Sequence, residues 1–273
     1  TFCLEYAPSM NFASIGGYHI REAGATRGKD MAFSFCFGKA YLRAGTDAGL
    51  DIDAVAPRLS FNAFGGSLEF FREIAFQRAA RRVWAKIMRQ EMGATNPRSW
   101  LLRQPAGAHM GYLNATRQRP LNNLTRAVVG AMASALSGGP PLAEPPFDEP
   151  LGLGWSREAM QLAEDASRIL QFEAHVTDVI DPLAGSYYVE SLTDQMEDEV
   201  QGIMRKIEEV GGAVAAIESG YMQREMTREA YERQVRIETG EQPVVGVNCF
   251  VGKDELEVSI NRFTPYPYDP RRR

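Results

Sequence analysis

Residues 11–25, NFASIGGYHIREAGA, decide the fold expected for this chain. Residues 11–20 are predicted to form a strand that ends in a Gly-Gly-Tyr-His turn, and residues 29–43 then place apolar side chains at helical spacing. This stretch therefore predicts one β/α unit, with Tyr18 and His19 at the turn that follows the strand. Such a turn is either a simple strand terminus with a hydrogen-bonded histidine or part of a catalytic site.

The same order of elements recurs along the chain. Further strands are expected at 57–63 and 100–103, and a short extended piece is expected to lead into residues 147–149. Helices are expected at 67–92, 122–137 and 156–173. This alternation argues for parallel β/α units and an α/β fold class. Four units are too few to close an eight-stranded barrel, so half of a barrel is supplied elsewhere or the sheet is open.

The pattern changes after Asp181. Residues 181–190 are expected to be a loop with a short extended segment, two helices follow at 192–218 and 224–239, and extended segments at 244–250 and 255–263 close the chain. We therefore divide the chain into residues 1–182, which carry the β/α units, and residues 183–273, a helical and extended segment that packs on them.

Composition and charge exclude several classes of function. The chain has 273 residues, of which 44% are hydrophobic and 24% charged, as in ordinary globular proteins. A net charge of -5 argues against nucleic-acid binding and against an anionic membrane surface. With neither a bilayer-spanning stretch nor a signal sequence, a cytoplasmic location is expected. Three scattered cysteines indicate neither a disulfide framework nor a metal site.

The strand expected at 57–63 is unusually polar on one side. Arg58, Ser60 and Asn62 alternate along it, and alternate residues of a strand share a face. Because barrel strands usually point apolar side chains inward, a polar inner face suggests that a polar or hydrated ligand runs through the barrel. The alternative is an edge strand whose polar face looks out to solvent.

The segment SIGGYHIREAGA (14–25) resembles the SISGYHIREAGA signature of the cobalamin-dependent acyl-CoA mutases, the methylmalonyl-CoA and isobutyryl-CoA mutase family. The similarity continues in order through AYLRAGTDAGLDID (40–53), APRLSFNA (56–63), FQRAARRVWAKIM (76–88), NPRSWLLR (96–103), RPLNN (119–123), FDE (147–149), VTDVIDPLAGSYYVE (176–190), GGAVAAIESGYMQRE (211–225) and GVNCF (246–250). It covers nearly the whole chain.

The resemblance implies a fold and an activity. The chain is expected to form the C-terminal half of a (β/α)8 TIM-type barrel, through which the pantetheine arm of coenzyme A is threaded. A separate domain presents adenosylcobalamin, whose homolysis generates the radical for a carbon-skeleton rearrangement, so the implied class is an isomerase.

The resemblance also implies roles for the residues of the first turn. Tyr18 matches the tyrosine that helps to drive off the adenosyl group and screens the radicals. His19 matches the histidine that donates a hydrogen bond to the thioester carbonyl. Glu22 and Glu149 match glutamates that lie near the corrin and the adenosyl ribose.

Three residues of the polar strand are the implied coenzyme A contacts. Arg58 matches an arginine that contacts the phosphates, and the planar guanidinium suits bidentate phosphate binding. Ser60 matches a serine that faces the coenzyme A arm, and Asn62 lies on the same face.

Two segments depart from the family pattern. Residues 104–107, Gln-Pro-Ala-Gly, stand where the family has HTQT, which removes a donor to the thioester, and His109 follows four positions beyond the lost histidine. Where the family has TQSLHTNSFDE, this chain has PPLAEPPFDE, so Pro140, Ala143 and Pro145 replace residues that contact cofactor and substrate. Of that segment, Glu149 is retained.

Three functions follow from these matches and departures. The first is an acyl-CoA mutase subunit that needs partner chains to supply the missing barrel half and the cobalamin domain. The second is a diverged enzyme that binds a CoA thioester and no longer uses cobalamin. The third is a non-catalytic partner of a full-length mutase, because an excised half-barrel exposes strand edges.

Overall fold

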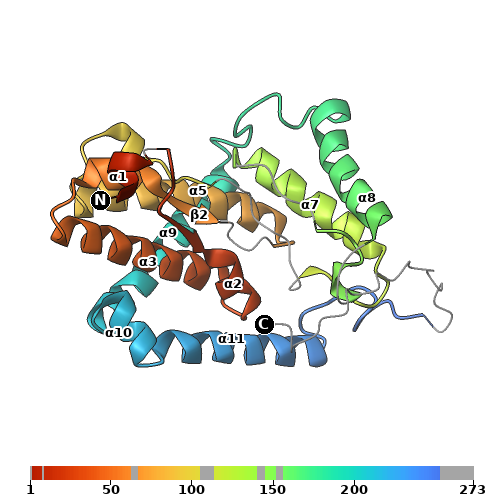
Figure 1. Cartoon of the computed structure of the whole chain (residues 1–273). Coiled ribbons are helices and arrows are strands. Elements are labelled where there is room, and N and C mark those ends of the chain that lie inside the picture. Colours follow the sequence, from red (N-terminus) through yellow and green to blue (C-terminus); the bar gives the residue numbers. More distant parts are fainter. Residues whose placement is uncertain are drawn as a thin grey trace, which may run out of the picture.

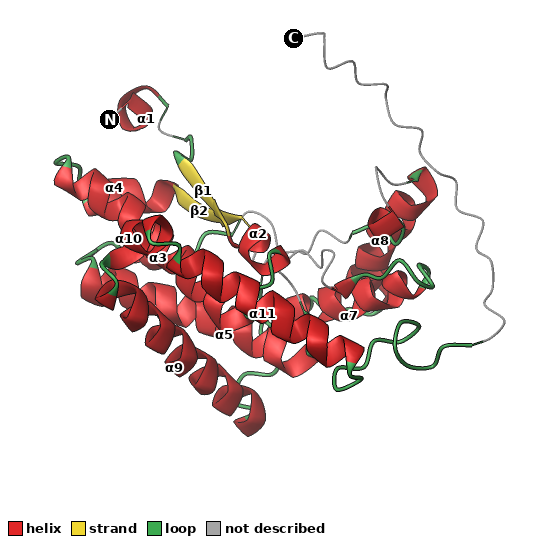
Figure 2. Ribbon diagram, turned by 90° about the horizontal axis from the view of Figure 1, so that it is seen from below, coloured by secondary structure: helices red, strands yellow, loops and turns green. Residues whose placement is uncertain are grey.

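A computed structural model describes residues 2–7, 9–62, 67–104, 114–139, 145–151 and 156–252. In these residues the strands β1 (Ala13–Gly16) and β2 (Leu59–Asn62) form a two-stranded parallel sheet. The register pairs Ala13 with Leu59 and Gly16 with Asn62. The remaining elements are helical, and the sheet lies at one edge of the helices (Figure 2).

The core forms where the sheet meets α3 (Arg27–Asp47) and α5 (Phe70–Lys86). Phe61 of β2 lies with its ring centroid 5.4 Å from that of Phe35 on α3 and 4.8 Å from that of Trp84 on α5. A Cβ added at Gly38 would lie 3.0 Å from both Phe61 and Trp84, so glycine lets α3 approach this cluster closely. One face of β2 is thereby buried against two helices.

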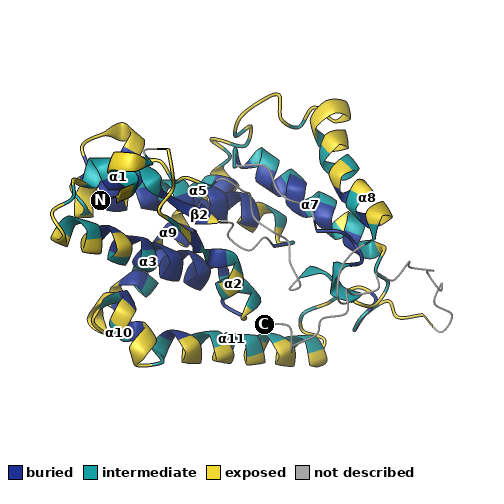
Figure 3. Ribbon diagram, viewed as in Figure 1, coloured by how far each residue is buried: buried dark blue, intermediate teal, exposed yellow. Residues whose placement is uncertain are grey.

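Three further helices are α9 (Tyr187–Glu209), α10 (Gly212–Glu218) and α11 (Tyr221–Glu238). α9 packs on both α3 and α5, α10 packs on α3 and α9, and α11 packs on α10. Two lysines of α3 join them: the Lys39 ammonium lies 2.7 Å from the Glu208 carboxylate, and Lys29 lies 2.8 Å from Glu225. Figure 3 shows buried residues gathered on α3, α5 and α9, with exposed residues along α10 and α11. α3 is consequently enclosed on most sides.

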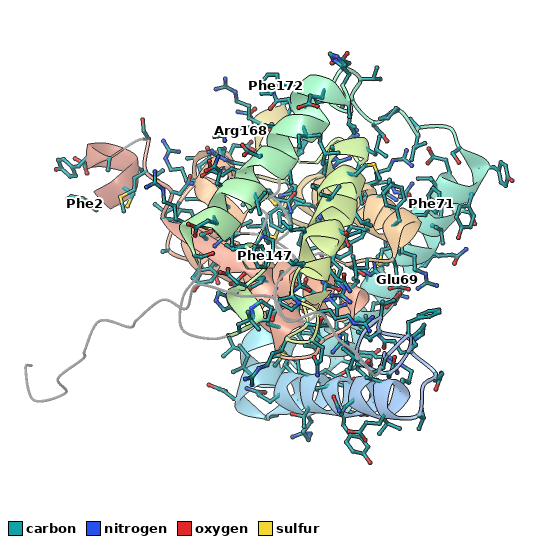
Figure 4. All side chains as sticks on the ribbon, turned by 90° about the vertical axis from the view of Figure 1, so that its right-hand side faces the viewer. Phe2, Glu69, Phe71, Phe147, Arg168 and Phe172 are labelled. Carbon is teal, nitrogen blue, oxygen red and sulfur yellow. The ribbon has the colours of Figure 1, made fainter. Side chains whose placement is uncertain are left out.

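On the other side of α5, α7 (Asn122–Leu136) packs between α5 and α8 (Arg157–Arg168) (Figure 1). Ser156 caps α8, because its hydroxyl accepts a hydrogen bond from the Ala159 amide at 3.1 Å. Figure 4 shows Arg168 and Phe172 at the outer end of the α8 region and Phe147 toward its inner end.

Short elements complete the described chain. They are the helices α1 (Phe2–Tyr6), α2 (Gly17–Glu22) and α4 (Ile52–Val55), the 3-10 turns Ala56–Arg58, Pro97–Trp100 and Glu149–Leu151, and the π-helical turns Ile87–Glu91 and Ile169–Glu173. No helix in this part of the chain is long and apolar enough to cross a membrane.

The helices expected at 67–92, 122–137 and 156–173 are confirmed, and so is the order strand then helix in the first unit. The strand expected at 11–20 is shorter than predicted, because it ends at Gly16 and Gly17–Glu22 form α2. The strand expected at 100–103 is wrong, because Asn96 caps a 3-10 turn that begins at Pro97. A single backbone hydrogen bond remains there, from the Phe61 amide to the Arg103 carbonyl at 2.8 Å. Most of the extended piece expected before residues 147–149 lies outside the described residues, and Glu149 begins a 3-10 turn.

The C-terminal region also differs in detail from the prediction. Residues 187–190 form the first turn of α9, because Val189 begins the apolar face that packs on α5, and this overrides the strand preference of the tyrosines. The helix expected at 192–218 breaks at Gly211 and Gly212, whose φ values are +108° and +88°. Residues 255–263 lie outside the described residues, and the division at residue 182 stays a prediction.

Candidate functional site

The Tyr-His turn is the start of a helix at the carboxyl end of β1. α2 follows β1 directly, and its spacing puts Tyr18 and His19 one helical turn before Glu22. A Cβ added at Gly16 would lie 3.1 Å from His19 Nδ1, so this glycine leaves room for the imidazole to fold back over the strand end. Three predicted site residues are therefore on one turn of one helix.

The two rings of the turn are in contact. The centroids of Tyr18 and His19 lie 5.2 Å apart with an interplanar angle of 74°, an edge-to-face arrangement that aromatic pairs favour. Tyr18 is half-buried and His19 is exposed. The imidazole is thus accessible to a ligand and is flanked on one side by the phenol.

α2 is held at its end by α11. Gly24 has a φ of +111°, and a Cβ at this position would approach the Cα of Ala230 on α11 to 2.9 Å. Arg21 donates a hydrogen bond to the Ala25 carbonyl across the same bend. Glycine is required at position 24 by both its backbone conformation and the close helix contact.

Glu149 comes close to the turn from far along the chain. Burial raises the pKa of the Glu149 carboxyl, and the negative charges of Glu22 and Asp148 raise it further. Asp148 is buried and accepts a hydrogen bond from the Ser156 amide at 2.8 Å, which ties this segment to the start of α8. The fold therefore brings together the two predicted glutamates, and Glu149 holds its proton to higher pH than an ordinary glutamic acid.

Ser60 and Asn62 lie beside the turn on β2. The register places Ser60 next to Ser14 and Asn62 next to Gly16, at the end of the sheet from which α2 starts. The two side chains share the face opposite Phe61. Ser60 is 1% exposed, with its hydroxyl 3.5 Å from the Ala13 carbonyl, whereas Asn62 is exposed.

The expectation that Arg58 shares a strand face with Ser60 and Asn62 is wrong. It belongs to the 3-10 turn Ala56–Arg58, before β2 begins, and its guanidinium donates to the Ala54 carbonyl at 2.6 Å. The turn precedes β2 because Pro57 at its start favours a tight turn. Arg58 thus lies at the opposite end of β2 from α2, across a four-residue strand of about 13 Å.

The segments that depart from the family pattern are only partly described. Gln104 and Pro145 are described, and Pro145 is buried. His109, Pro140 and Ala143 lie outside the described residues. Among the residues that the structure does describe, no group of three or more His, Cys, Asp or Glu side chains is arranged to hold a metal ion.

A small parallel sheet covered by helices, with polar side chains at the carboxyl ends of its strands, is compatible with the α/β class of proteins. The chain belongs to the methylmalonyl-CoA mutase family, whose sequence profile matches residues 1–269.

Individual relatives agree with this assignment. The chain is 41% identical over 243 residues to the methylmalonyl-CoA mutase large subunit of Porphyromonas gingivalis, covering 89% of this chain and 33% of that protein. It is 38% identical over 253 residues to a probable mitochondrial methylmalonyl-CoA mutase of Caenorhabditis elegans, covering 93% and 34%. To the 2-hydroxyisobutanoyl-CoA mutase large subunit of Aquincola tertiaricarbonis it is 37% identical over 273 residues, covering 98% and 46%. The chain therefore spans between a third and a half of the length of these relatives.

Proposed function

We propose that this chain is the part of an acyl-CoA mutase that binds a CoA thioester at the α2 turn and takes part in an adenosylcobalamin-dependent carbon-skeleton rearrangement. The observation that carries the proposal is the convergence of Tyr18, His19 and Glu22 on α2 with Glu149 from a distant segment. The names of the relatives suggest methylmalonyl-CoA or a related acyl-CoA as substrate.

In this proposal His19 is the catalytic donor. Its exposed imidazole is free to approach a ligand, and an N–H group aimed at the thioester oxygen stabilises negative charge that develops there. Tyr18 packs edge-on against the imidazole, which limits the positions that His19 takes and shields one side of the ligand from water. A rotation of His19 away from the strand end would break this contact.

The adjacent carboxyl groups fit a cofactor rich in hydroxyl and amide groups. Glu22 and Glu149 are half-buried and close enough for their charges to interact. Carboxyl groups accept hydrogen bonds from the hydroxyls of an adenosyl ribose and the amides of a corrin, and a carboxyl with a raised pKa, such as that of Glu149, is more readily protonated and then also donates one. When bound, adenosylcobalamin supplies a carbon radical by homolysis of its cobalt–carbon bond.

The coenzyme A arm is proposed to run along the polar side of β2. Asn62 lies at the α2 end, near the thioester, and Arg58 lies at the other end, where it binds the phosphates; the buried Ser60 lies between them. The spacing of about 13 Å suits an extended arm with its charged head and reactive group at opposite ends.

We further propose that residues 1–182 form half of a (β/α)8 barrel on which residues 183–273 pack, and that partner chains complete the barrel and present cobalamin. Exposed apolar side chains near α8 support a partner surface: Phe172 is 66% exposed and Ile180 is 85% exposed. A cytoplasmic hetero-oligomer is the corresponding assembly.

A second candidate function is that of a CoA-thioester enzyme that no longer uses cobalamin. The buried Pro145, which has no backbone N–H and no polar side chain, favours it, because a family residue that contacts cofactor or substrate is lost there. Turnover of an acyl-CoA without cobalamin would select this candidate. The third candidate, a non-catalytic partner of a full mutase, would bind the mutase and show no affinity for acyl-CoA.

Calorimetric titration of the purified chain with methylmalonyl-CoA tests the binding site. We expect saturable binding that is weakened by His19→Ala and unchanged by His175→Ala, a matched control whose exposed imidazole lies 3.5 Å from the Asp178 carboxylate. Equal loss in both variants, or no binding by the unmodified chain, would contradict the proposed site.

A further inference from the structure

A large cavity lies beside the proposed thioester site. It has a volume of 1210 Å³ and lies between the α2–α3 junction, the start of α7, and α11 with the segment that follows it. Figure 1 shows α11 running beneath α2 toward this segment. The seven side chains assigned above to the thioester, coenzyme A and cofactor do not line it.

The charged side chains that line this cavity are mostly arginines. They are Arg21, Arg27, Arg72, Arg117, Arg126, Arg233 and Arg236, against Glu69, Glu199, Glu229 and Glu241. Two of these glutamates are already engaged in ion pairs, Glu69 with Arg27 and Glu229 with Lys29. The lining, which we call the arginine chamber, therefore carries an excess of positive charge.

Arg126 connects the walls of the arginine chamber through neutral oxygens. Its guanidinium donates to Thr116 Oγ1 at 2.9 Å, to Asn123 Oδ1 at 2.7 Å and to the Val245 carbonyl at 3.0 Å. Burial lowers the pKa of this half-buried arginine. These three hydrogen bonds fix the position of the Arg126 guanidinium, and none of the three acceptors is a carboxylate that would neutralise its charge.

A second group of arginines comes together from α2 and α11. Burial lowers the pKa of Arg233 and the positive charges of Arg21 and Arg236 lower it further, whereas the charge of Glu22 raises it. Burial also lowers the pKa of Arg21, and the charges of Asp30, Glu73, Glu22 and Glu229 oppose this effect. The Arg21 Nε is buried and has no hydrogen-bond partner among the described residues. These carboxylates offset part of the repulsion between the arginines, and an anion bound in this partly buried space would offset more of it.

We infer that the arginine chamber is a second binding site, for a small molecule that carries a diphosphate group. Guanidinium groups match phosphate oxygens with paired hydrogen bonds, and several at one place favour more than one phosphate. A volume of 1210 Å³ accommodates a ligand larger than a single phosphate ion. The site goes beyond the proposed thioester function.

The diphosphate group could belong to either of two ligands, which experiment can distinguish. One is a free diphosphate or triphosphate metabolite, and the other is the phosphate-bearing head of the CoA thioester itself. Titrations with inorganic pyrophosphate, CoA and pantetheine separate them, because pantetheine lacks the phosphates. Loss of CoA affinity in a chamber variant but not in Arg58→Gln would identify CoA as the source; the reverse would identify a separate metabolite.

The test is calorimetry of the full chain with inorganic pyrophosphate. The double variant Arg233→Gln/Arg236→Gln is expected to bind pyrophosphate about tenfold or more weakly, as loss of charge-assisted hydrogen bonds predicts. Arg228→Gln is the matched control, because this exposed arginine on the same helix pairs with Glu225 and does not line the chamber. Thermal melting checks that each variant is folded.

No binding of pyrophosphate by the unmodified chain, or equal affinity in the double variant and the control, would overturn the inference. His19→Ala is expected to leave pyrophosphate binding unchanged. A failure of the arginine chamber is thereby distinguished from a failure of the thioester site, which the methylmalonyl-CoA titration reports.

Discussion

Replacing Gly24 with alanine is expected to lower the free energy of unfolding by about 2–5 kcal/mol, the sum of two costs. Holding an L-residue in left-handed backbone space costs about 1–2 kcal/mol, and Gly24 has a φ of +111°. The added methyl group would approach the Cα of Ala230 to 2.9 Å, and forcing an extra carbon into a packed contact costs about 1–3 kcal/mol.

Gly49→Ala isolates the first of these costs. Gly49 has a φ of +84°, and nothing lies within 4 Å of a Cβ added there. Urea unfolding followed by circular dichroism is expected to show a loss of about 1–2 kcal/mol for this control, with a larger loss for Gly24→Ala. Equal losses in the two variants would refute the claim that α2 and α11 are in close contact at Gly24.

Ala230→Gly provides a further check on the same contact. It removes the methyl group opposite Gly24 and, by itself, costs about 1 kcal/mol of helix stability. The double variant Gly24→Ala/Ala230→Gly should lose less unfolding free energy than the sum of the two single losses, because it lacks one of the two methyl groups that would overlap. Strict additivity would count against direct contact.

Three further predictions concern the core and two carboxyl groups. Phe61→Ala should cost about 3–5 kcal/mol in urea unfolding, since Phe61 is 1% exposed and contacts two aromatic rings; a loss below 1 kcal/mol would contradict its place in the core. Glu149→Gln should raise the melting temperature at neutral pH, because the raised pKa of Glu149 means that its ionised form destabilises the fold; the gain should vanish below its ordinary pKa of 4.5. Asp53→Asn should have the opposite pH dependence. Hydrogen bonds from Thr95 lower the pKa of Asp53 from 3.8 to about 2, so melting curves should show a deficit above pH 3.8 that disappears as the pH falls toward 2.

Long periodic segments were the most predictable part of the fold. The helices at 122–137 and 156–173 were expected from spacing and from stop signals such as Gly138, and both are present. The segment at 100–103 was not predictable in this way. Its residues favour a strand, but Pro97 and the Asn96 cap commit the preceding residues to a 3-10 turn.

The candidate site was predictable from family resemblance and much less from local pattern. No periodicity relates Glu22 to Glu149, and their proximity depends on how α7 and α8 pack on the rest of the molecule. The polar spacing of Arg58, Ser60 and Asn62 suggested one strand face, whereas Arg58 is the last residue of a 3-10 turn that Pro57 favours, and the strand begins after it.

The arginine chamber had no signal in the sequence. Arg21, Arg126 and Arg233 each lie in helices where an arginine is usually a solvated surface residue. Their convergence arises from the packing of α11 beneath α2 and from the bond between Arg126 and Val245. Tertiary structure alone brings these charges together.

The most direct test of the central claim is whether His19 recognises the thioester carbonyl. Calorimetry would compare an acyl-CoA with the matching CoA thioether, in which a methylene group replaces the carbonyl, for the unmodified chain and for His19→Ala. We expect His19→Ala to weaken acyl-CoA binding by about tenfold, the effect of losing one hydrogen bond of about 1.4 kcal/mol, and to leave thioether binding unchanged. Equal weakening of both ligands would contradict it, because His19 would then act on some other part of the ligand or on the fold.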